Sequence, residues 1–217
     1  TPDGLDWITG LFYLKEDGSG GIDLLFDGLA IEITEENVTE AYAAFGQMTY
    51  DVNPKLRATF GLRYSYESKN YGYVTNVNGG LDDTGTPDDS WSAWTPRFAL
   101  DYDLADDIMI YASATSGFKS GGFQIGDGTS FEQEDLWSYE TGIKSTLLEN
   151  RLRANVGLFL YDYTNLQVVE YDDDTGISTT TNAGEATIQG IEGEFVARVI
   201  DNSNQCLTRH CRPTLMT

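Results

Sequence analysis

Apolar and polar residues alternate along several stretches of this chain, and this alternation restricts its fold more than any other feature. Between positions 56 and 66 every second residue is aliphatic or aromatic, with Arg, Thr, Gly and Ser between them. Successive side chains of a strand point to opposite faces, so each such strand has one apolar face and one polar face. The pattern recurs at 94–104, 137–144 and 151–160. Strands of about ten residues with this alternation are what a membrane-crossing β-barrel needs.

The alternation predicts an all-β chain, an antiparallel meander of about eight long strands. The expected strands are 5–14, 39–52, 55–67, 91–104, 107–117, 135–147, 151–171 and 178–199. Three connections are short, namely 53–54, 105–106 and 148–150. The others are mostly long and rich in Gly, Asp, Ser and Thr, namely 15–38, 68–90, 118–134 and 172–177. Short turns at one end and long loops at the other are typical of outer-membrane barrels, so we expect part of a larger transmembrane barrel.

The same alternation predicts whether each turn has an odd or an even number of residues. A register slip of one residue would exchange the two faces of a strand. Apolar positions are even-numbered on both sides of Pro54, which predicts a three-residue turn at Val52-Asn53-Pro54. Leu104 and Ile108 share a face in the same way. Apolar positions change from odd to even numbers near Glu149-Asn150, which predicts a two-residue turn there.

Charge and aromatic content exclude some classes of function. The formal charge is -22, from 35 acidic and 13 basic residues, which argues against a nucleic-acid partner. Aromatic residues make up 12% of the chain, too many for a disordered acidic tail. Tyr and Trp gather near strand ends, as in the aromatic girdles of membrane barrels. These residues are Tyr64, Tyr66, Trp91, Trp94, Trp137, Tyr139, Tyr161 and Tyr163.

Residues 201–217 differ from the rest, so we divide the chain into a barrel part, 1–200, and a disordered tail, 201–217. The tail has no alternation and no aromatic residue, and it holds both cysteines and the single histidine. Cys206, His210 and Cys211 provide three possible metal ligands without a fourth, so we expect no metal site there.

The sequence predicts no enzyme and no cofactor. Two Asp-Thr-Gly triplets, at 83–85 and 174–176, resemble the catalytic triplets of aspartic proteases. They lie in acidic, Gly-rich loops without the apolar walls that would hold a shared proton. Such loops could instead bind Ca²⁺ through carboxylates, which leaves a soluble acidic β-sandwich or adhesin-type binding module as an alternative. That alternative would bury Leu56, Phe60, Leu62, Phe98 and Leu100 between two sheets.

Several motifs resemble the C-terminal half of TonB-dependent outer-membrane receptors. These motifs occur in the same order as in the family. They are the run from Tyr111 to Phe123, the segment Ser138-Tyr139-Glu140-Thr141-Gly142-Ile143-Lys144, and the pair Asn182-Ala183-Gly184 with Gly190-Ile191-Glu192-Gly193-Glu194. The resemblance covers nearly all of 5–199. The family's barrels have about 22 strands, and its members carry an N-terminal plug domain and an energy-coupling box that this sequence lacks. The resemblance therefore implies a truncated piece of the barrel.

The resemblance implies a fragment of a receptor for energy-coupled uptake of a scarce nutrient, most often a ferric siderophore, in the Gram-negative outer membrane. Its expected partners are outer-membrane lipid, the periplasmic protein TonB through the missing plug domain, and the small-molecule ligand. For ligand contact in the extracellular loops we name Phe118, Lys119, Phe123 and Phe131. The charged residues expected to face the lumen are Arg57, Arg63, Arg97, Glu140, Lys144, Arg151 and Arg153.

Overall fold

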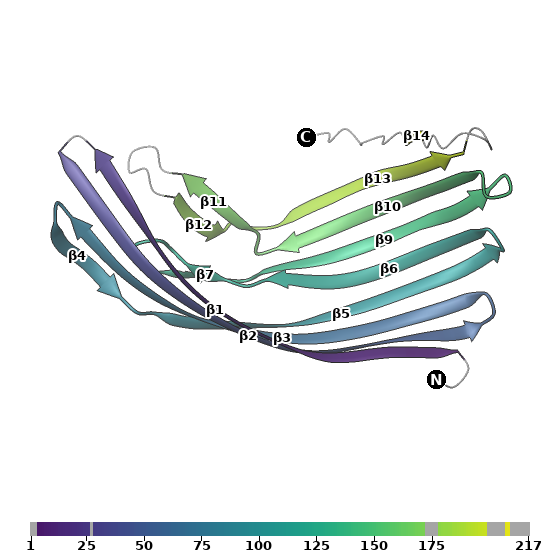
Figure 1. Cartoon of the computed structure of the whole chain (residues 1–217), viewed down its shortest axis with the longest axis horizontal. Coiled ribbons are helices and arrows are strands. Elements are labelled where there is room, and N and C mark those ends of the chain that lie inside the picture. The colour runs from purple at the N-terminus through teal and green to yellow at the C-terminus, as the bar shows by residue number, and fades with distance from the viewer. Residues whose placement is uncertain (1–3, 27, 172–177, 199–206, 209–217) are drawn as a thin grey trace.

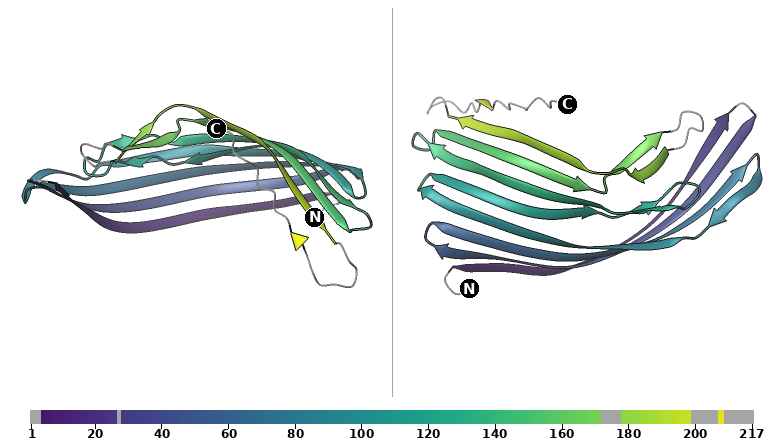
Figure 2. Two further views of the ribbon diagram at one scale, coloured as in Figure 1. Left: turned by 90° about the horizontal axis from the view of Figure 1, so that it is seen from above. Right: turned by 180° about the vertical axis from the view of Figure 1, so that it is seen from behind.

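The chain forms one curved antiparallel sheet in a single layer. A computed structural model describes residues 4–26, 28–171, 178–198 and 207–208. The sheet has the strand order β1-β2-β3-β5-β6-β9-β10-β13-β14, with β4 paired to β3 beside this path. Figures 1 and 2 show that no second layer covers the sheet within the described residues. The same residues contain no helix long and apolar enough to cross a membrane. The predicted all-β meander is confirmed, as an open sheet.

The long strands of the sheet are β1 (Leu5–Phe26), β2 (Leu29–Asn53), β3 (Leu56–Val77), β5 (Asp88–Ala105), β6 (Ile108–Lys119), β9 (Glu134–Leu147), β10 (Leu152–Thr164) and β13 (Ala186–Ala197). The short strands are β4 (Gly80–Gly85), β7 (Gly122–Phe123), β8 (Ser130–Phe131), β11 (Gln167–Tyr171), β12 (Ser178–Asn182) and β14 (Leu207–Thr208). Two pairs of short strands, β7–β8 and β11–β12, form small sheets of their own.

The register of the strands sorts the side chains as the alternation predicts. Met48 pairs with Phe60, Phe60 with Phe98, Phe98 with Ala114, and Ala114 with Tyr139, so one apolar row crosses five strands. Paired residues share a face of a sheet. We call this side the apolar face and the opposite side the polar face.

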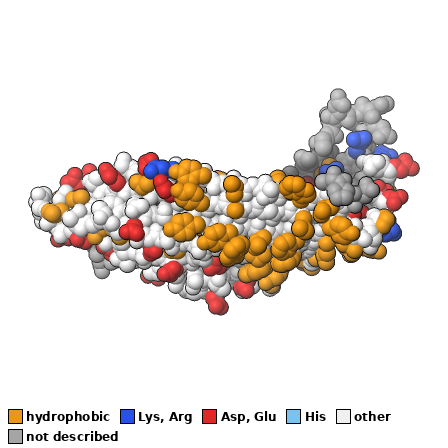
Figure 3. Space-filling view, turned by 90° about the horizontal axis from the view of Figure 1, so that it is seen from below, with side chains coloured by type: hydrophobic (Ala, Val, Ile, Leu, Met, Phe, Trp, Pro, Cys, Tyr) orange, Lys and Arg blue, Asp and Glu red, His pale blue; other side chains and the backbone are white. Residues whose placement is uncertain are grey.

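Side chains of the apolar face are exposed because nothing packs on them. Phe60 is 41% exposed, Phe98 49% and Leu100 52%. Figure 3 shows apolar side chains gathered over the half of the sheet nearer the short turns, and acidic side chains scattered over the other half. A sandwich would bury these residues between two sheets, so the alternative of a soluble β-sandwich is wrong.

Two connections that the sequence analysis places in loops are strands. Residues 15–26 and 29–38 extend β1 and β2 into one long hairpin, in which Leu25 pairs with Ala30. Most of 68–90 is likewise strand, because β3 continues to Val77 and turns back into β4. Gly and Asp have low strand propensity, but pairing with a neighbouring strand gives this part of the backbone hydrogen-bond partners. Figure 1 shows these hairpins rising beyond the rest of the sheet at the end opposite the short turns.

Two predicted strands are each divided in two. The expected strand 151–171 breaks after Thr164 at Asn165, which has a positive φ of 52°. The expected strand 178–199 breaks at 183–185, next to Gly184 with a φ of 124°. As a result the β11–β12 hairpin leaves the main sheet and bends away from β10 and β13 (Figure 1).

The predicted parities hold, while two of the predicted turn lengths are wrong. Tyr50 pairs with Ala58, so even positions face even positions. The extra residue that makes the count odd lies in a bulge between Asp51 and Asn53. A two-residue turn at Pro54 and Lys55 follows this bulge. Tyr102 pairs with Ile110 across a similar bulge. In the third turn Leu147 pairs with Leu152, which makes a four-residue loop, even as predicted but two residues longer.

The most tightly packed side chains lie on the polar face, at the loop end of the sheet. They include Ile33 (4% exposed), Tyr71 (5%), Tyr73 (8%) and Trp91 (5%). The segment between β6 and β9 covers this region, because Gly126 N and Gly126 O bond to Tyr71 and Thr75. The small core of the described chain therefore lies beneath a loop and not between two layers. The predicted tail, 201–217, lies outside the described residues except for β14, which pairs with Val196 and Ala197.

Candidate functional site

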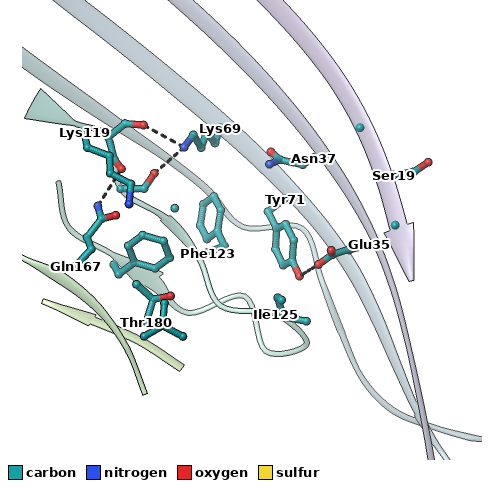
Figure 4. A pocket seen from close by; sticks show the side chains of 17 residues that line it. Ser19, Glu35, Asn37, Lys69, Tyr71, Lys119, Phe123, Ile125, Gln167 and Thr180 are labelled. Carbon is teal, nitrogen blue, oxygen red and sulfur yellow. Dashed lines mark hydrogen bonds between the residues drawn. The ribbon is translucent and has the colours of Figure 1, made fainter. Parts of the chain in front are cut away.

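A cavity of about 540 Å³ lies at the loop end of the polar face. Its walls come from the upper parts of β1, β2 and β3, from the segment between β6 and β9, and from the β11–β12 hairpin (Figure 4). Its lining combines aromatic, aliphatic, amide, hydroxyl and charged side chains. The volume falls in the range of small-molecule sites, which is about 300–1,000 Å³. The cavity is therefore large enough to hold part of a small ligand.

Lys69 fastens the loop after β6 to the wall of the cavity. Its Nζ donates to Gly121 O at 2.7 Å and to Ser120 Oγ at 3.1 Å. The carboxylate of Glu67 lies 3.2 Å from the same Nζ and accepts a hydrogen bond from Ser120 Oγ at 2.5 Å. Lys69 and Glu67 are two residues apart on β3, so their side chains share the polar face. The ammonium group of Lys69 therefore already has hydrogen-bond and ion-pair partners within the protein.

Aromatic rings form one side of the cavity. Phe123 stacks on Tyr71 with ring centroids 5.5 Å apart and planes 11° apart, and it meets Trp91 edge-on at 6.2 Å. The Tyr71 hydroxyl donates to Glu35 Oε2 at 2.6 Å. Burial raises the pKa of Tyr71 above its ordinary value of 10.0, and the bond to Glu35 adds to the rise. Tyr71 therefore stays neutral and holds the Glu35 carboxylate at the cavity wall.

The β11–β12 hairpin is joined to the same loop. Gln167 Nε2 donates to Ser120 O and to Glu132 O, each at 3.0 Å. Asn182 Nδ2 donates to Glu132 O at 2.9 Å, and Asn182 Oδ1 accepts from Glu132 N at 2.9 Å. These bonds connect residues that are 35 to 50 positions apart in the chain. They give the cavity a floor and walls with defined positions.

Three of the four residues predicted to contact a ligand line this cavity. Lys119, Phe123 and Phe131 are among its lining residues, whereas Phe118 is not. Ligand contact by these four residues stays a prediction.

The charged residues predicted to face the lumen fall mostly on the polar face. Arg97 and Lys144 line a second, polar depression together with Glu140. Arg57 lies 3.9 Å from Asp101, and the Arg63 guanidinium lies over the rings of Phe12 and Phe45 at 5.4 and 5.9 Å. The remaining pair stands near the short turns, Arg153 at the start of β10 and Arg151 in the turn before it. Whether this face lines a lumen stays a prediction for all seven residues.

The acidic loops offer no assembled cation site in the described part of the chain, where no three His, Cys, Asp or Glu side chains gather to hold a metal. Asp83 instead accepts hydrogen bonds from Tyr73 OH at 3.0 Å and from Thr84 N at 2.8 Å. Asp89 accepts from Ser90 N at 2.8 Å. The other candidate loop, 172–174, lies outside the described residues.

Sequence reasoning missed Glu35, Lys69, Tyr71 and Gln167, which all line the cavity. The first three lie in the predicted loops 15–38 and 68–90, which are rich in Gly, Asp, Ser and Thr. A usable signal was present, since Tyr71, Tyr73 and Thr75 alternate with Gly72, Val74 and Asn76. No local signal shows that the segment after β6 folds back onto these residues.

A family model confirms the resemblance. Residues 3–207 match the model of the TonB dependent receptor-like β-barrel. The chain belongs to this family. Barrels of this family lie in the outer membrane of Gram-negative bacteria, so the predicted location is confirmed. The family consists of transport receptors and not of enzymes.

Relatives among characterised proteins include receptors named for metal-pseudopaline and for ferric pyoverdine. The metal-pseudopaline receptor CntO of Pseudomonas aeruginosa is 27% identical over 162 residues, which are 75% of this chain and 22% of that receptor. The ferric-pyoverdine M114 receptor PbuA of a Pseudomonas species is 28% identical over 164 residues, 74% of this chain and 19% of that receptor. The chain thus spans about a fifth of the length of these relatives.

Solved structures of TonB-dependent receptors share the fold. The ferric yersiniabactin uptake receptor FyuA from Yersinia pestis superposes with a TM-score of 0.78 at 20% identity, over 93% of this chain and 31% of FyuA. The copper transporter OprC superposes with a TM-score of 0.66 at 14% identity, over 90% of this chain and 37% of OprC. The open sheet therefore has the shape of a segment of such a barrel wall.

Proposed function

We propose that this chain is a wall segment of an outer-membrane receptor that takes up a scarce nutrient, in the first place a ferric siderophore. The observation that carries this proposal is the family match over 3–207, together with relatives named for metal-chelate uptake. The exposed apolar face supports it, because a barrel wall presents such a band to lipid. In this proposal no bond of the nutrient is made or broken.

The cavity is the part of the wall that we assign to ligand contact. It lies on the polar face at the end with long hairpins, which is the extracellular end of an outer-membrane barrel. Lys119, Phe123 and Phe131 are the predicted residues best placed for contact, and Tyr71 and Glu35 join them. Contact with TonB is assigned to a plug domain outside residues 1–217.

Uptake of radiolabelled iron tests this function. Cells whose only receptor for ferric chelates is the full-length protein should accumulate iron from at least one siderophore, and only with intact TonB and the membrane potential. Cells lacking the receptor gene are the control. Equal uptake with and without the receptor, across hydroxamate, catecholate and mixed siderophores, contradicts the proposal.

A further inference from the structure

The cavity presents a largely uncharged surface to a ligand. Phe123, Phe131, Ile125 and Val169 supply aromatic and aliphatic contacts, and Ile125 and Val169 are 40% and 64% exposed. Asn37, Gln167 and Thr180 add neutral hydrogen-bonding groups. A ligand that fits this lining has apolar linkers between a few polar groups.

Only one of the two cations at the cavity can meet a ligand as a free charge. Lys69 is neutralised by Glu67 at 3.2 Å and is also bonded to Ser120 and Gly121. Its side chain is only 18% exposed. Lys119 is exposed, and no carboxylate of the described residues lies within 4.0 Å of it. The cationic contribution of this wall is therefore a single lysine.

Carboxylates outnumber that lysine. Glu35 lines the cavity, where its carboxylate accepts from Tyr71. Glu134 accepts a hydrogen bond at 2.9 Å from the backbone N of Gln167, which is a lining residue. Asp127 lies close enough to Tyr71 and Tyr73 to raise the pKa of both. Like charges repel an anion that must leave water to enter, so this wall disfavours ligands with several negative charges.

We propose that the cavity selects ferric chelates of zero or positive net charge, with trihydroxamates as their chemical class, over triply negative tris-catecholates. The inference rests on the proposed function. Three hydroxamates neutralise iron(III), whereas three catecholates leave a threefold negative charge on the complex. Trihydroxamates also carry aliphatic linkers, which match the apolar lining.

Equilibrium binding to the purified full-length receptor tests this selection. The probes are ferrioxamine B (singly positive), ferrichrome (neutral) and ferric enterobactin (triply negative), each followed by quenching of intrinsic fluorescence. We expect at least one trihydroxamate complex to bind about tenfold or more tightly than the tris-catecholate at physiological salt. Glu35→Gln, which keeps the acceptor for Tyr71, should improve binding of the tris-catecholate about threefold and change the trihydroxamates little.

Glu36→Gln is the matched control. Glu36 is the next residue on β2, is exposed, and lies on the opposite face, so its neutralisation should leave all three affinities unchanged. Tris-catecholate binding as tight as that of the trihydroxamates overturns the inference while leaving the proposed function intact. An equal effect of Glu35→Gln and Glu36→Gln overturns it as well. Failure of all three complexes to bind counts against the proposed function itself.

Discussion

Among the glycines of the loop over the cavity, Gly121 has the least space for a Cβ atom. A Cβ atom at this position would lie 2.1 Å from Phe131 O and 2.4 Å from Trp91 Cε2. Real Cβ atoms essentially never approach backbone or ring atoms so closely. The close contact between the loop and the β5 wall therefore depends on the absence of a side chain.

We predict that Gly121→Ala lifts the loop between β6 and β9 from the wall. The measurement is limited proteolysis of the full-length receptor, in which cleavage within 120–134 should become several-fold faster. Gly117→Ala is the matched control, because nothing lies within 4 Å of a Cβ atom there. Unchanged cleavage in the Gly121 variant contradicts this account of the loop.

A substitution at Phe98 can test whether the apolar face contacts lipid or water. It lies midway between Trp94 and Tyr102 on β5, at the centre of the exposed band. Phe98→Lys should lower the free energy of unfolding by about 2–4 kcal/mol, as charged residues do at the bilayer midplane. Denaturant titration of the full-length receptor in lipid vesicles measures this loss. Ala99→Lys, on the polar face, should cost about 1 kcal/mol or less, and equal losses would refute the assignment of faces.

At the scale of elements, the decisive feature is that a loop and a hairpin are held by a few polar side chains. The segment between β6 and β9 contains two strands of two residues each, so its own backbone pairing is slight. Its position comes from Lys69 on one side and from Gln167 and Asn182 on the other. Donors and acceptors that are partly shielded from water in this way hold a loop in place, because leaving one unpaired costs free energy.

Lys69→Met should loosen this segment, because it removes two hydrogen bonds to the loop and leaves Glu67 without its ion pair. The cost for each partly buried group left unpaired is about 1–3 kcal/mol. Amide hydrogen exchange of 120–134 in the full-length receptor should accelerate at least tenfold. Lys55→Met, in the exposed turn after β2, provides the control and should leave these amides unchanged. Persistent protection in the Lys69 variant would show that other contacts hold the loop.

At the scale of the whole molecule, the sheet has an exposed apolar face and two open edges. Among the described residues, β1 pairs only with β2, and β13 pairs beyond β10 only at Val196 and Ala197. Exposed edges and large apolar patches both favour association with other chains. In a closed barrel, neighbouring strands and lipid would cover them.

We therefore predict that the 217-residue chain by itself associates in plain buffer. Size-exclusion chromatography with light scattering should show large, heterogeneous particles without detergent. The same preparation in detergent micelles is the control and should be more uniform. A monodisperse monomer in plain buffer contradicts the assignment of the exposed face to lipid.

The sequence alone determined the faces of the strands and the parity of their turns. Met48, Phe60 and Phe98 share one face because alternation is a local property with a period of two residues. Family motifs near Gly117–Phe123 and Tyr139–Lys144 identified the type of barrel for the same reason, since they are short runs of chain.

Only the tertiary structure decided where the strands end and what closes the cavity. β1 continues through a stretch rich in Gly and Asp because β2 pairs with it along its whole length. The contact of Lys69 with Gly121 joins residues 52 positions apart, and the contact of Asn182 with Glu132 joins residues 50 apart. No local pattern encodes such pairs, because their energy arises only when distant segments meet.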